Sequence, residues 1–180
     1  MSDVLQLLAL SGSLRKGSHN TDALLALTRL APASVQIALG SIADLPLFNP
    51  DWEGEPLGAV MRLKSAVAQA DGIILASPEY AHGISGPMKN ALDWLVSGEE
   101  FPNKPTMLIN TSPRAHHAQD ALREVLITMS ARIIDAAFVS IPLLGSKLDL
   151  DGILSDPYLV KALQDGLRQF CQGICSDQAP

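Results

Sequence analysis

Residues 4–20 read VLQLLALSGSLRKGSHN, an apolar run of strand length that passes directly into a polar loop. The apolar run is typical of a buried strand, and the pattern behind the loop predicts a helix that begins near Ser18. Glycines let such a loop turn sharply, and its hydroxyl, amide and cationic side chains can bind an anion at the positive end of that helix. The stretch therefore predicts a strand, a loop and a helix. It leaves open whether the loop holds a phosphate or is a polar turn in which Ser18 or Asn20 caps the helix.

Short apolar runs alternate with longer helix-like segments along the rest of the chain, which is typical of a parallel sheet with helices on both faces. The sequence predicts strands at about 4–10, 35–39, 72–76, 106–110 and 132–140. It predicts helices at about 18–31, 58–70, 87–96 and 118–129, a last helix after Asp156-Pro157, and loops over 45–56 and 142–152. With 180 residues and no internal repeat, the chain is expected to form one three-layer α/β domain over residues 1–180.

Three loops of unusual composition are expected to follow the first, third and fourth strands, namely 11–20, 77–86 and 111–117. Ligands of open α/β sheets bind beyond the carboxyl ends of the strands, where the strand order reverses. The loops after the first and third strands flank that point when a five-stranded sheet has the order 2-1-3-4-5. We therefore expect this order, and a phosphorylated ligand where the three loops meet.

Charge and cysteine content argue against several classes of protein. Nineteen acidic residues against thirteen basic ones give a formal charge of -6 without a long basic run, so we expect neither nucleic acid nor a membrane as partner. No apolar run reaches the ~20 residues that cross a bilayer, and no secretion signal is visible, so a cytoplasmic protein is expected. Cys171 and Cys175 are expected to be small apolar residues on one face of the last helix. No metal site is expected, because the adjacent His116 and His117 specify no geometry.

The loop motifs narrow the choice of phosphorylated ligand. No segment matches G-x-x-x-x-G-K-[ST] or G-x-G-x-x-G, which disfavours ATP and a NAD bound in the Rossmann manner. The loop SPEYAHGISG at 77–86 combines glycines that allow close backbone approach with Tyr80, whose flat ring suits a planar ligand. A flavin whose phosphate lies in the loop 11–20 satisfies both loops at once.

The same residues carry a resemblance to a known family. The loop SGSLRKGSHN at 11–20 resembles the phosphate loop of the NADPH-dependent FMN reductases, and SPEY at 77–80 with KNALDW at 89–94 resembles their second signature. The resemblance covers nearly the whole chain and implies a flavodoxin-like fold with non-covalent FMN and with NADPH or NADH as co-substrate. It implies small-molecule electron acceptors, namely quinones, flavins, chromate or azo compounds. It also implies a homodimer or homotetramer in which a neighbouring subunit borders the flavin.

The resemblance further implies which residues hold FMN. Its phosphate would be held by Ser11, Ser13, Arg15, Ser18 and Asn20, its ring would be lined by Pro78, Glu79 and Tyr80, and Ser112 would complete the pocket. The chain departs from the family pattern at Ala81 and Ser85, where Asn and Pro are common, and in the loop 111–117, which lacks the usual glycines.

No side chain is expected to be a catalytic acid or base, because the flavin N5 itself would accept and donate the hydride. Sharing of one site by NAD(P)H and the acceptor predicts ping-pong kinetics. Glu79 is also explained as a partner of the backbone or of another subunit, and His82 as an exposed loop residue or a contact to substrate or subunit. Two alternatives stay open: a flavodoxin-like electron carrier or redox-responsive flavoprotein without its own substrate, and a sugar-phosphate binder or hydrolase. No G-x-S-x-G elbow supports the hydrolase.

Overall fold

Parallel strands form the central sheet of the protein. The computed structural model describes residues 4–114 and 116–176. In the sheet, β2 (Val35–Gly40), β1 (Leu5–Ser11), β3 (Gly72–Ala76) and β6 (Pro105–Asn110) lie side by side in that order. Beyond β6, the short strands β7 (Arg132–Ile133) and β8 (Val139–Ser140) both pair with it in parallel. Taken together as a fifth strand, they confirm the predicted order 2-1-3-4-5.

The fifth strand is broken in its middle, where the sequence predicted one continuous strand over 132–140. The short 3-10 helix η2 (Asp135–Ala137) separates its two halves. The ladder with β6 continues on both sides of this break: the Ile134 N–H donates to the Thr106 carbonyl, and the Ile141 N–H donates to the Asn110 carbonyl. An edge strand pairs on one side only, so a turn within it disrupts no second ladder.

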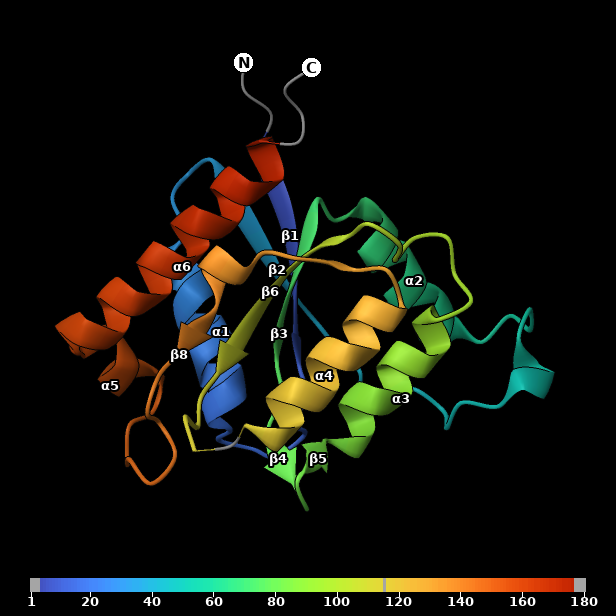
Figure 1. Cartoon of the computed structure of the whole chain (residues 1–180), viewed down its shortest axis with the longest axis horizontal. Coiled ribbons are helices and arrows are strands. Elements are labelled where there is room, and N and C mark those ends of the chain that lie inside the picture. The colour runs from blue at the N-terminus through green and yellow to red at the C-terminus, as the bar shows by residue number, and fades with distance from the viewer. Residues whose placement is uncertain (1–3, 115, 177–180) are drawn as a thin grey trace.

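Helices cover both faces of the sheet, as the alternation predicted (Figure 1). On one face lie α1 (His19–Leu30), α5 (Leu150–Ser155) and α6 (Pro157–Ser176), and on the other lie α2 (Gly58–Gln69), α3 (Gly86–Leu95) and α4 (His117–Thr128). Strand side chains alternate between the two cores. Leu7 and Ala9 of β1 pack in the first core, and Leu8 and Leu10 pack in the second. All five residues of β3 are buried because both of its faces are covered.

Two segments expected to be loops contain regular structure. Within 142–152, α5 begins at Leu150, because the Asp149 carboxylate caps it by accepting a hydrogen bond of 2.9 Å from the Gly152 N–H. Within 77–86, β4 (Glu79–Tyr80) and β5 (Gly83–Ile84) form a small antiparallel hairpin. Its two turn residues, Ala81 and His82, have positive φ angles of 50° and 58°. Such a turn usually carries Asn-Gly, so the sequence here gave no hairpin signal.

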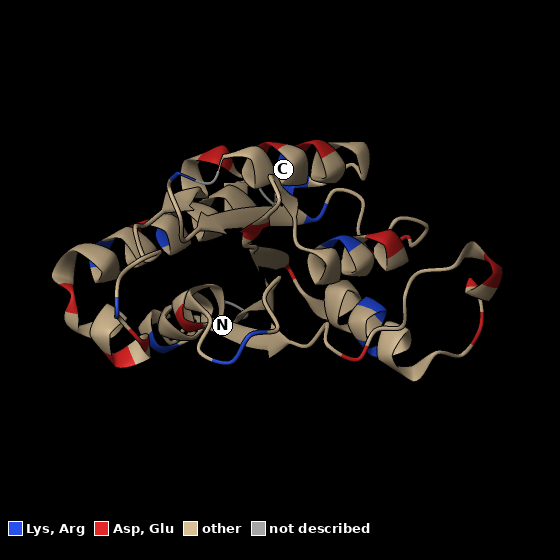
Figure 2. Cartoon of the chain, turned by 90° about the horizontal axis from the view of Figure 1, so that it is seen from below, with Lys and Arg blue, Asp and Glu red and all other residues tan. Residues whose placement is uncertain are grey.

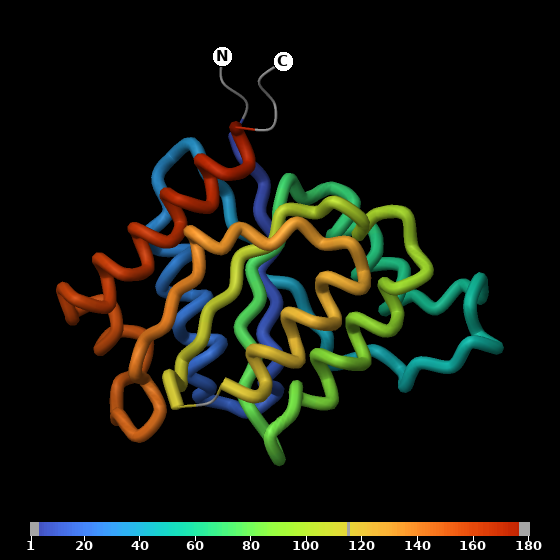
Figure 3. Tube along the Cα trace, in the orientation of Figure 1, coloured from blue at the N-terminus to red at the C-terminus, as the bar shows by residue number. Residues whose placement is uncertain are grey.

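The segment between β2 and α2 extends away from the rest of the chain (Figure 3). Apart from the short 3-10 helix η1 (Pro50–Trp52), it is irregular, as predicted. Side chains of α3 anchor its first part, because Asn90 and Trp94 both donate hydrogen bonds to the Pro46 carbonyl, at 2.9 and 2.8 Å. The Asn90 side-chain oxygen also accepts from the Phe48 N–H at 2.8 Å.

Lys and Arg are dispersed among Asp and Glu over the helices and loops in the view of Figure 2. In that view the described part of the chain shows no continuous basic stripe of the kind that binds nucleic acid. None of the described helices is both long and apolar enough to cross a membrane.

Candidate functional site

A cavity of about 350 Å³ opens at the carboxyl edge of the sheet. This volume lies in the range of small-molecule sites, which runs from roughly 300 to 1,000 Å³. Three segments that are far apart in the sequence contribute to its wall: 13–20 after β1, 77–80 after β3, and 110–114 at the end of β6. Leu144 adds an apolar side chain from the loop before α5. The three loops that the sequence singled out therefore do meet, although Ala115 of the third loop lies outside the described residues.

The first loop is fixed at its start by a close approach of backbone to side chains. The Gly12 N–H donates to the Ala76 carbonyl at 2.8 Å, and the Gly12 carbonyl accepts from the Ser85 hydroxyl at 2.7 Å. A Cβ atom on Gly12 would lie 2.7 Å from the Ser77 hydroxyl oxygen and 2.8 Å from that of Ser85. The absence of a side chain at Gly12 thus lets the first loop pack directly against the second. At the tip of the first loop, Gly17 has a φ of +65°, which glycine adopts without strain.

The N-terminus of α1 is left open toward the cavity. Ser18 is the N-cap by its backbone angles, but its hydroxyl makes no capping hydrogen bond, and its side chain is buried in the cavity wall. His19 also lines the cavity, and its buried Nδ1 has no hydrogen-bond partner. The first N–H groups of a helix have no partner within the helix and carry partial positive charge. Free helix N–H groups, an unused hydroxyl and a neighbouring Arg15 are the donors that a phosphate needs.

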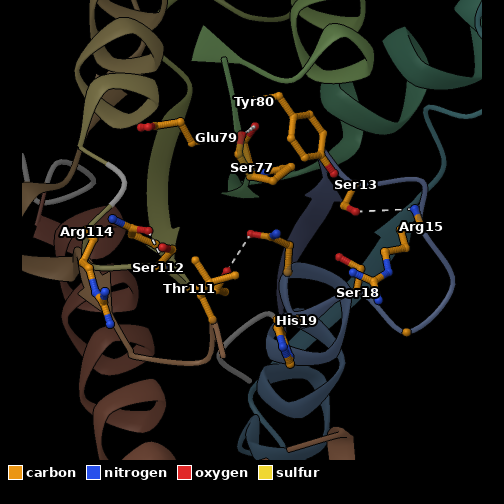
Figure 4. A pocket seen from close by; sticks show the side chains of 15 residues that line it. Ser13, Arg15, Ser18, His19, Ser77, Glu79, Tyr80, Thr111, Ser112 and Arg114 are labelled. Carbon is orange, nitrogen blue, oxygen red and sulfur yellow. Dashed lines mark hydrogen bonds between the residues drawn. The ribbon is translucent and has the colours of Figure 1, made fainter. Parts of the chain in front are cut away.

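A buried hydrogen bond joins the first loop to the third. Asn20 is buried, and its side-chain oxygen accepts from the Thr111 hydroxyl at 3.1 Å (Figure 4). At the start of the third loop, the Asn110 side-chain oxygen accepts from the Ser112 N–H at 2.9 Å. The Asn20–Thr111 bond ties the two sides of the cavity together, and the Asn110–Ser112 bond shapes the third loop. Asn20 therefore has a positioning role besides any contact that it makes with a ligand.

In the second loop, the side chains of Tyr80 and Glu79 point in different directions. Tyr80 is 56% exposed, and its ring lies on the side of Ser13 (Figure 4). The Glu79 carboxylate points away from Tyr80, and its Oε2 accepts from the Ala118 N–H at 2.9 Å, in the first turn of α4. Glu79 Oε1 lies 3.5 Å from His82 Nδ1. Because both of its oxygens face protein groups, Glu79 braces the hairpin against α4.

Eight of the nine residues that the resemblance assigned to FMN line this cavity, and Ser11 does not. The Ser11 hydroxyl faces Thr21, with 2.8 Å between the two oxygens, on the other side of the first loop. The cavity is also lined by residues that the resemblance did not assign to FMN: Gly17, His19, Ser77, Asn110, Thr111, Arg114 and Leu144. Asn110 and Thr111 could have been found from their position at the end of a predicted strand, where polar residues follow an apolar run.

Three histidines, His82, His116 and His117, gather beside the cavity and are not part of its wall. The His117 ring lies 4.5 Å from the His82 ring and 4.1 Å from the His116 ring, measured between centroids. Across residues 4–114 and 116–176, no three His, Cys, Asp or Glu side chains are arranged to hold a metal ion.

Near the open end of α1, burial raises the pKa of Asp22 above its ordinary value, and the neighbouring His19 opposes this rise.

Known proteins resemble the chain in sequence and in structure. The model of the family described as NADPH-dependent FMN reductase matches residues 5–143. A quinone reductase of Escherichia coli is 39% identical over 145 residues, which cover 75% of this chain and 76% of that protein. An NAD(P)H-dependent FMN reductase of Pseudomonas aeruginosa is 33% identical over 176 residues, covering 93% and 94%. The structure of FerB, a flavoenzyme NAD(P)H:(acceptor) oxidoreductase from Paracoccus denitrificans, superposes with a TM-score of 0.82 at 29% identity and covers 96% of this chain and 98% of that one.

Proposed function

The chain belongs to the NADPH-dependent FMN reductase family, and from that premise we propose that its cavity binds FMN and admits NAD(P)H and an electron acceptor in turn. Family membership makes the protein an oxidoreductase that depends on FMN and NAD(P)H. What we add is the assignment of residues, the order of events and the class of acceptor. The observation that carries the assignment is the meeting of three loops at one cavity, with phosphate donors in the first loop and the Tyr80 ring in the second.

The first loop is proposed to hold the FMN phosphate. Ser13 and Ser18 offer hydroxyls, Arg15 offers a guanidinium, and α1 offers its open N-terminus. Asn20 completes this set, and its bond to Thr111 fixes it in place. The Ser11 hydroxyl is engaged with Thr21, so we withdraw Ser11 from direct contact and assign it to the shape of the loop.

The second and third loops are proposed to hold the ring. Pro78, the backbone of Glu79 and the ring of Tyr80 form one wall, and Ser112 lies on the other side of the cavity (Figure 4). FMN, when bound, supplies the atom that accepts a hydride from NAD(P)H and later gives it to the acceptor. The protein has to position these partners and exclude other reactions. No acid–base side chain is assigned to the reaction, since the Glu79 carboxylate is held by α4 and His82.

Sharing of one site by both substrates leads to a ping-pong mechanism with small acceptors. Quinones, flavins, chromate and azo compounds are the proposed acceptors, and the quinone reductase of Escherichia coli supports quinones first. We further propose that the protein acts in the cytoplasm, where NAD(P)H is available. A homodimer or homotetramer is proposed because apolar side chains are exposed on the 45–56 segment and on α2, among them Leu47, Trp52 and Met61.

The experiment is steady-state kinetics of the FMN-loaded protein with NADPH or NADH against a neutral quinone. Parallel double-reciprocal lines, together with a yellow protein that binds FMN in a one-to-one titration, are the expected result. Intersecting lines would refute the shared site while leaving the flavin assignment intact. A protein that binds FMN but oxidises NAD(P)H negligibly would instead be the electron carrier that the sequence left open. Light scattering of the same preparation measures the oligomeric state.

A further inference from the structure

Two arginine side chains line the cavity, and they come from different loops. Arg15 belongs to the first loop and Arg114 to the third, and Figure 4 shows them on opposite sides of the cavity. Both residues are exposed. Within residues 4–114 and 116–176, neither guanidinium has a carboxylate partner among the ion pairs. The cavity therefore presents positive charge at two separate places, in a chain whose formal charge is -6.

The protein's own carboxylates do not neutralise Arg114. Among the described residues that line the cavity, Glu79 is the one acidic side chain. Its Oε2 accepts from the Ala118 N–H, its Oε1 faces His82, and its side chain is only 15% exposed. Arg114 is thus free to pair with an anion that arrives from solvent.

The FMN phosphate does not account for Arg114. The first loop already offers two hydroxyls, a helix N-terminus and Arg15 to that phosphate. Arg114 lies across the cavity from this loop (Figure 4). A second anion is therefore expected on a ligand that enters after FMN is in place.

The backbone of the third loop is restricted next to Arg114. The Ser112 N–H bond to the Asn110 side chain and the ring of Pro113 restrict the backbone just before Arg114. The Arg114 carbonyl also lies 3.4 Å from His116 Nδ1. A restricted backbone lowers the entropy that binding would otherwise cost.

On the basis of the proposed function, we infer that Arg114 binds the 2′-phosphate of NADPH and gives this protein a preference for NADPH over NADH. The two nucleotides differ only in that phosphate. A guanidinium binds a phosphate through two parallel hydrogen bonds, and lysine does not reproduce this fork. The family description names NADPH, but similar proteins are named for NADPH, for NADH or for both, so membership does not fix the preference of this chain. Arg114 supplies a determinant that belongs to this chain.

The test compares the wild-type FMN-loaded protein with Arg114→Gln, Arg114→Lys and the control Arg62→Gln. Arg62 is an exposed residue of α2 that does not line the cavity. Calorimetry measures binding of 2′,5′-ADP, which carries the 2′-phosphate, and of 5′-ADP, which lacks it. Rapid mixing without oxygen measures kcat/KM for flavin reduction by NADPH and by NADH.

Loss of a charge-assisted phosphate contact predicts that Arg114→Gln weakens 2′,5′-ADP binding by about ten- to a hundredfold. The value of kcat/KM for NADPH is expected to fall by a similar factor. Binding of 5′-ADP, kcat/KM for NADH and FMN affinity stay within about twofold of wild type, on the same reasoning. Arg114→Lys recovers part of the loss, and Arg62→Gln behaves as wild type.

Several results would overturn the inference while the proposed function survives. One is an equal loss for both nucleotides, which would place Arg114 at the pyrophosphate or the flavin. Another is no loss at all. A third is that Arg114→Gln slows the reaction with a sulfonated naphthoquinone but not with a neutral quinone, while its affinity for NADPH is unchanged. That result would show that Arg114 binds an anionic acceptor. If the wild-type protein binds no FMN, or if neither nucleotide reduces it, the proposed function fails and this inference fails with it.

Discussion

Replacement of Gly12 by alanine tests whether the close packing of the first two loops builds the site. The new Cβ would lie 2.7 Å from Ser77 Oγ, 2.8 Å from Ser85 Oγ and 3.1 Å from Met88 Cβ. All three neighbours are buried, and the Ser85 hydroxyl is held by the Gly12 carbonyl and by its role as N-cap of α3. The side chains therefore cannot move aside freely, and the first loop has to shift away from the second.

The expected cost follows from three contributions. Overpacking of a buried site costs about 1–3 kcal/mol, and a weakened Ser85 hydrogen bond costs about 0.5–1.5 kcal/mol. The smaller conformational entropy of an unfolded alanine offsets about 0.4–1 kcal/mol. The free energy of unfolding of Gly12→Ala is therefore expected to fall by about 0.5–4 kcal/mol in the FMN-free protein. FMN affinity is expected to fall as well, because Ser77 and Ser13 line the same cavity.

Urea unfolding followed by circular dichroism measures the stability, and a fluorescence titration measures FMN affinity. Gly86→Ala is the matched control, because its Cβ would meet no atom within 4 Å and the residue is exposed at the start of α3. Combining Gly12→Ala with Ser77→Ala removes the shortest contact, and the pair is expected to be less unstable than the sum of the single changes. A Gly12→Ala protein within about 0.5 kcal/mol of wild type, with unchanged FMN affinity, would refute the argument from close packing.

Further predictions concern the phosphate loop, the extended segment and the partly buried carboxylate of Asp22. Ser18→Ala is expected to weaken FMN binding about tenfold, whereas Ser11→Ala changes it less because that hydroxyl faces Thr21; equal losses in a titration would contradict the assignment. Asn90→Ala removes two hydrogen bonds to the 45–56 segment and is expected to lower the free energy of unfolding by about 1–3 kcal/mol, measured with urea. Proteolysis of that segment should become faster. Unaltered proteolysis would argue that Asn90 does not anchor the segment. Burial raises the folded-state pKa of Asp22 above its ordinary value of 3.8, so its ionised form disfavours folding. Asp22→Asn is therefore expected to raise the free energy of unfolding at neutral pH, and this gain should vanish as the pH falls below 3.8. A lower free energy of unfolding at neutral pH, measured by urea unfolding, would contradict this prediction.

Local patterns of the chain were sufficient to predict its framework. The run 72–76 is apolar throughout because β3 is covered on both faces. Such a strand can be recognised from its own residues, without knowledge of its neighbours in the sheet. Glycine, serine and cations behind the first strand indicated an anion site, because the chemistry of that loop depends on residues that are adjacent in the sequence. The order of the strands followed from the alternation with helices and from the positions of the polar loops.

Contacts between distant segments were decided only by the tertiary structure. Ser11 and Ser13 carry the same side chain and lie in the same loop, yet Ser13 lines the cavity while Ser11 faces Thr21. The bond of Asn20 to Thr111 and the approach of Gly12 to Ser77 each join residues that no local pattern relates. Nothing in the sequence distinguishes Arg114 from other loop cations. Only the structure shows that it lies across the cavity from Arg15. Propensity and hydrophobic period act over a few residues and fix which segments form strands and helices. The direction in which a loop side chain points depends on what packs against it, and that is determined only when the loops meet.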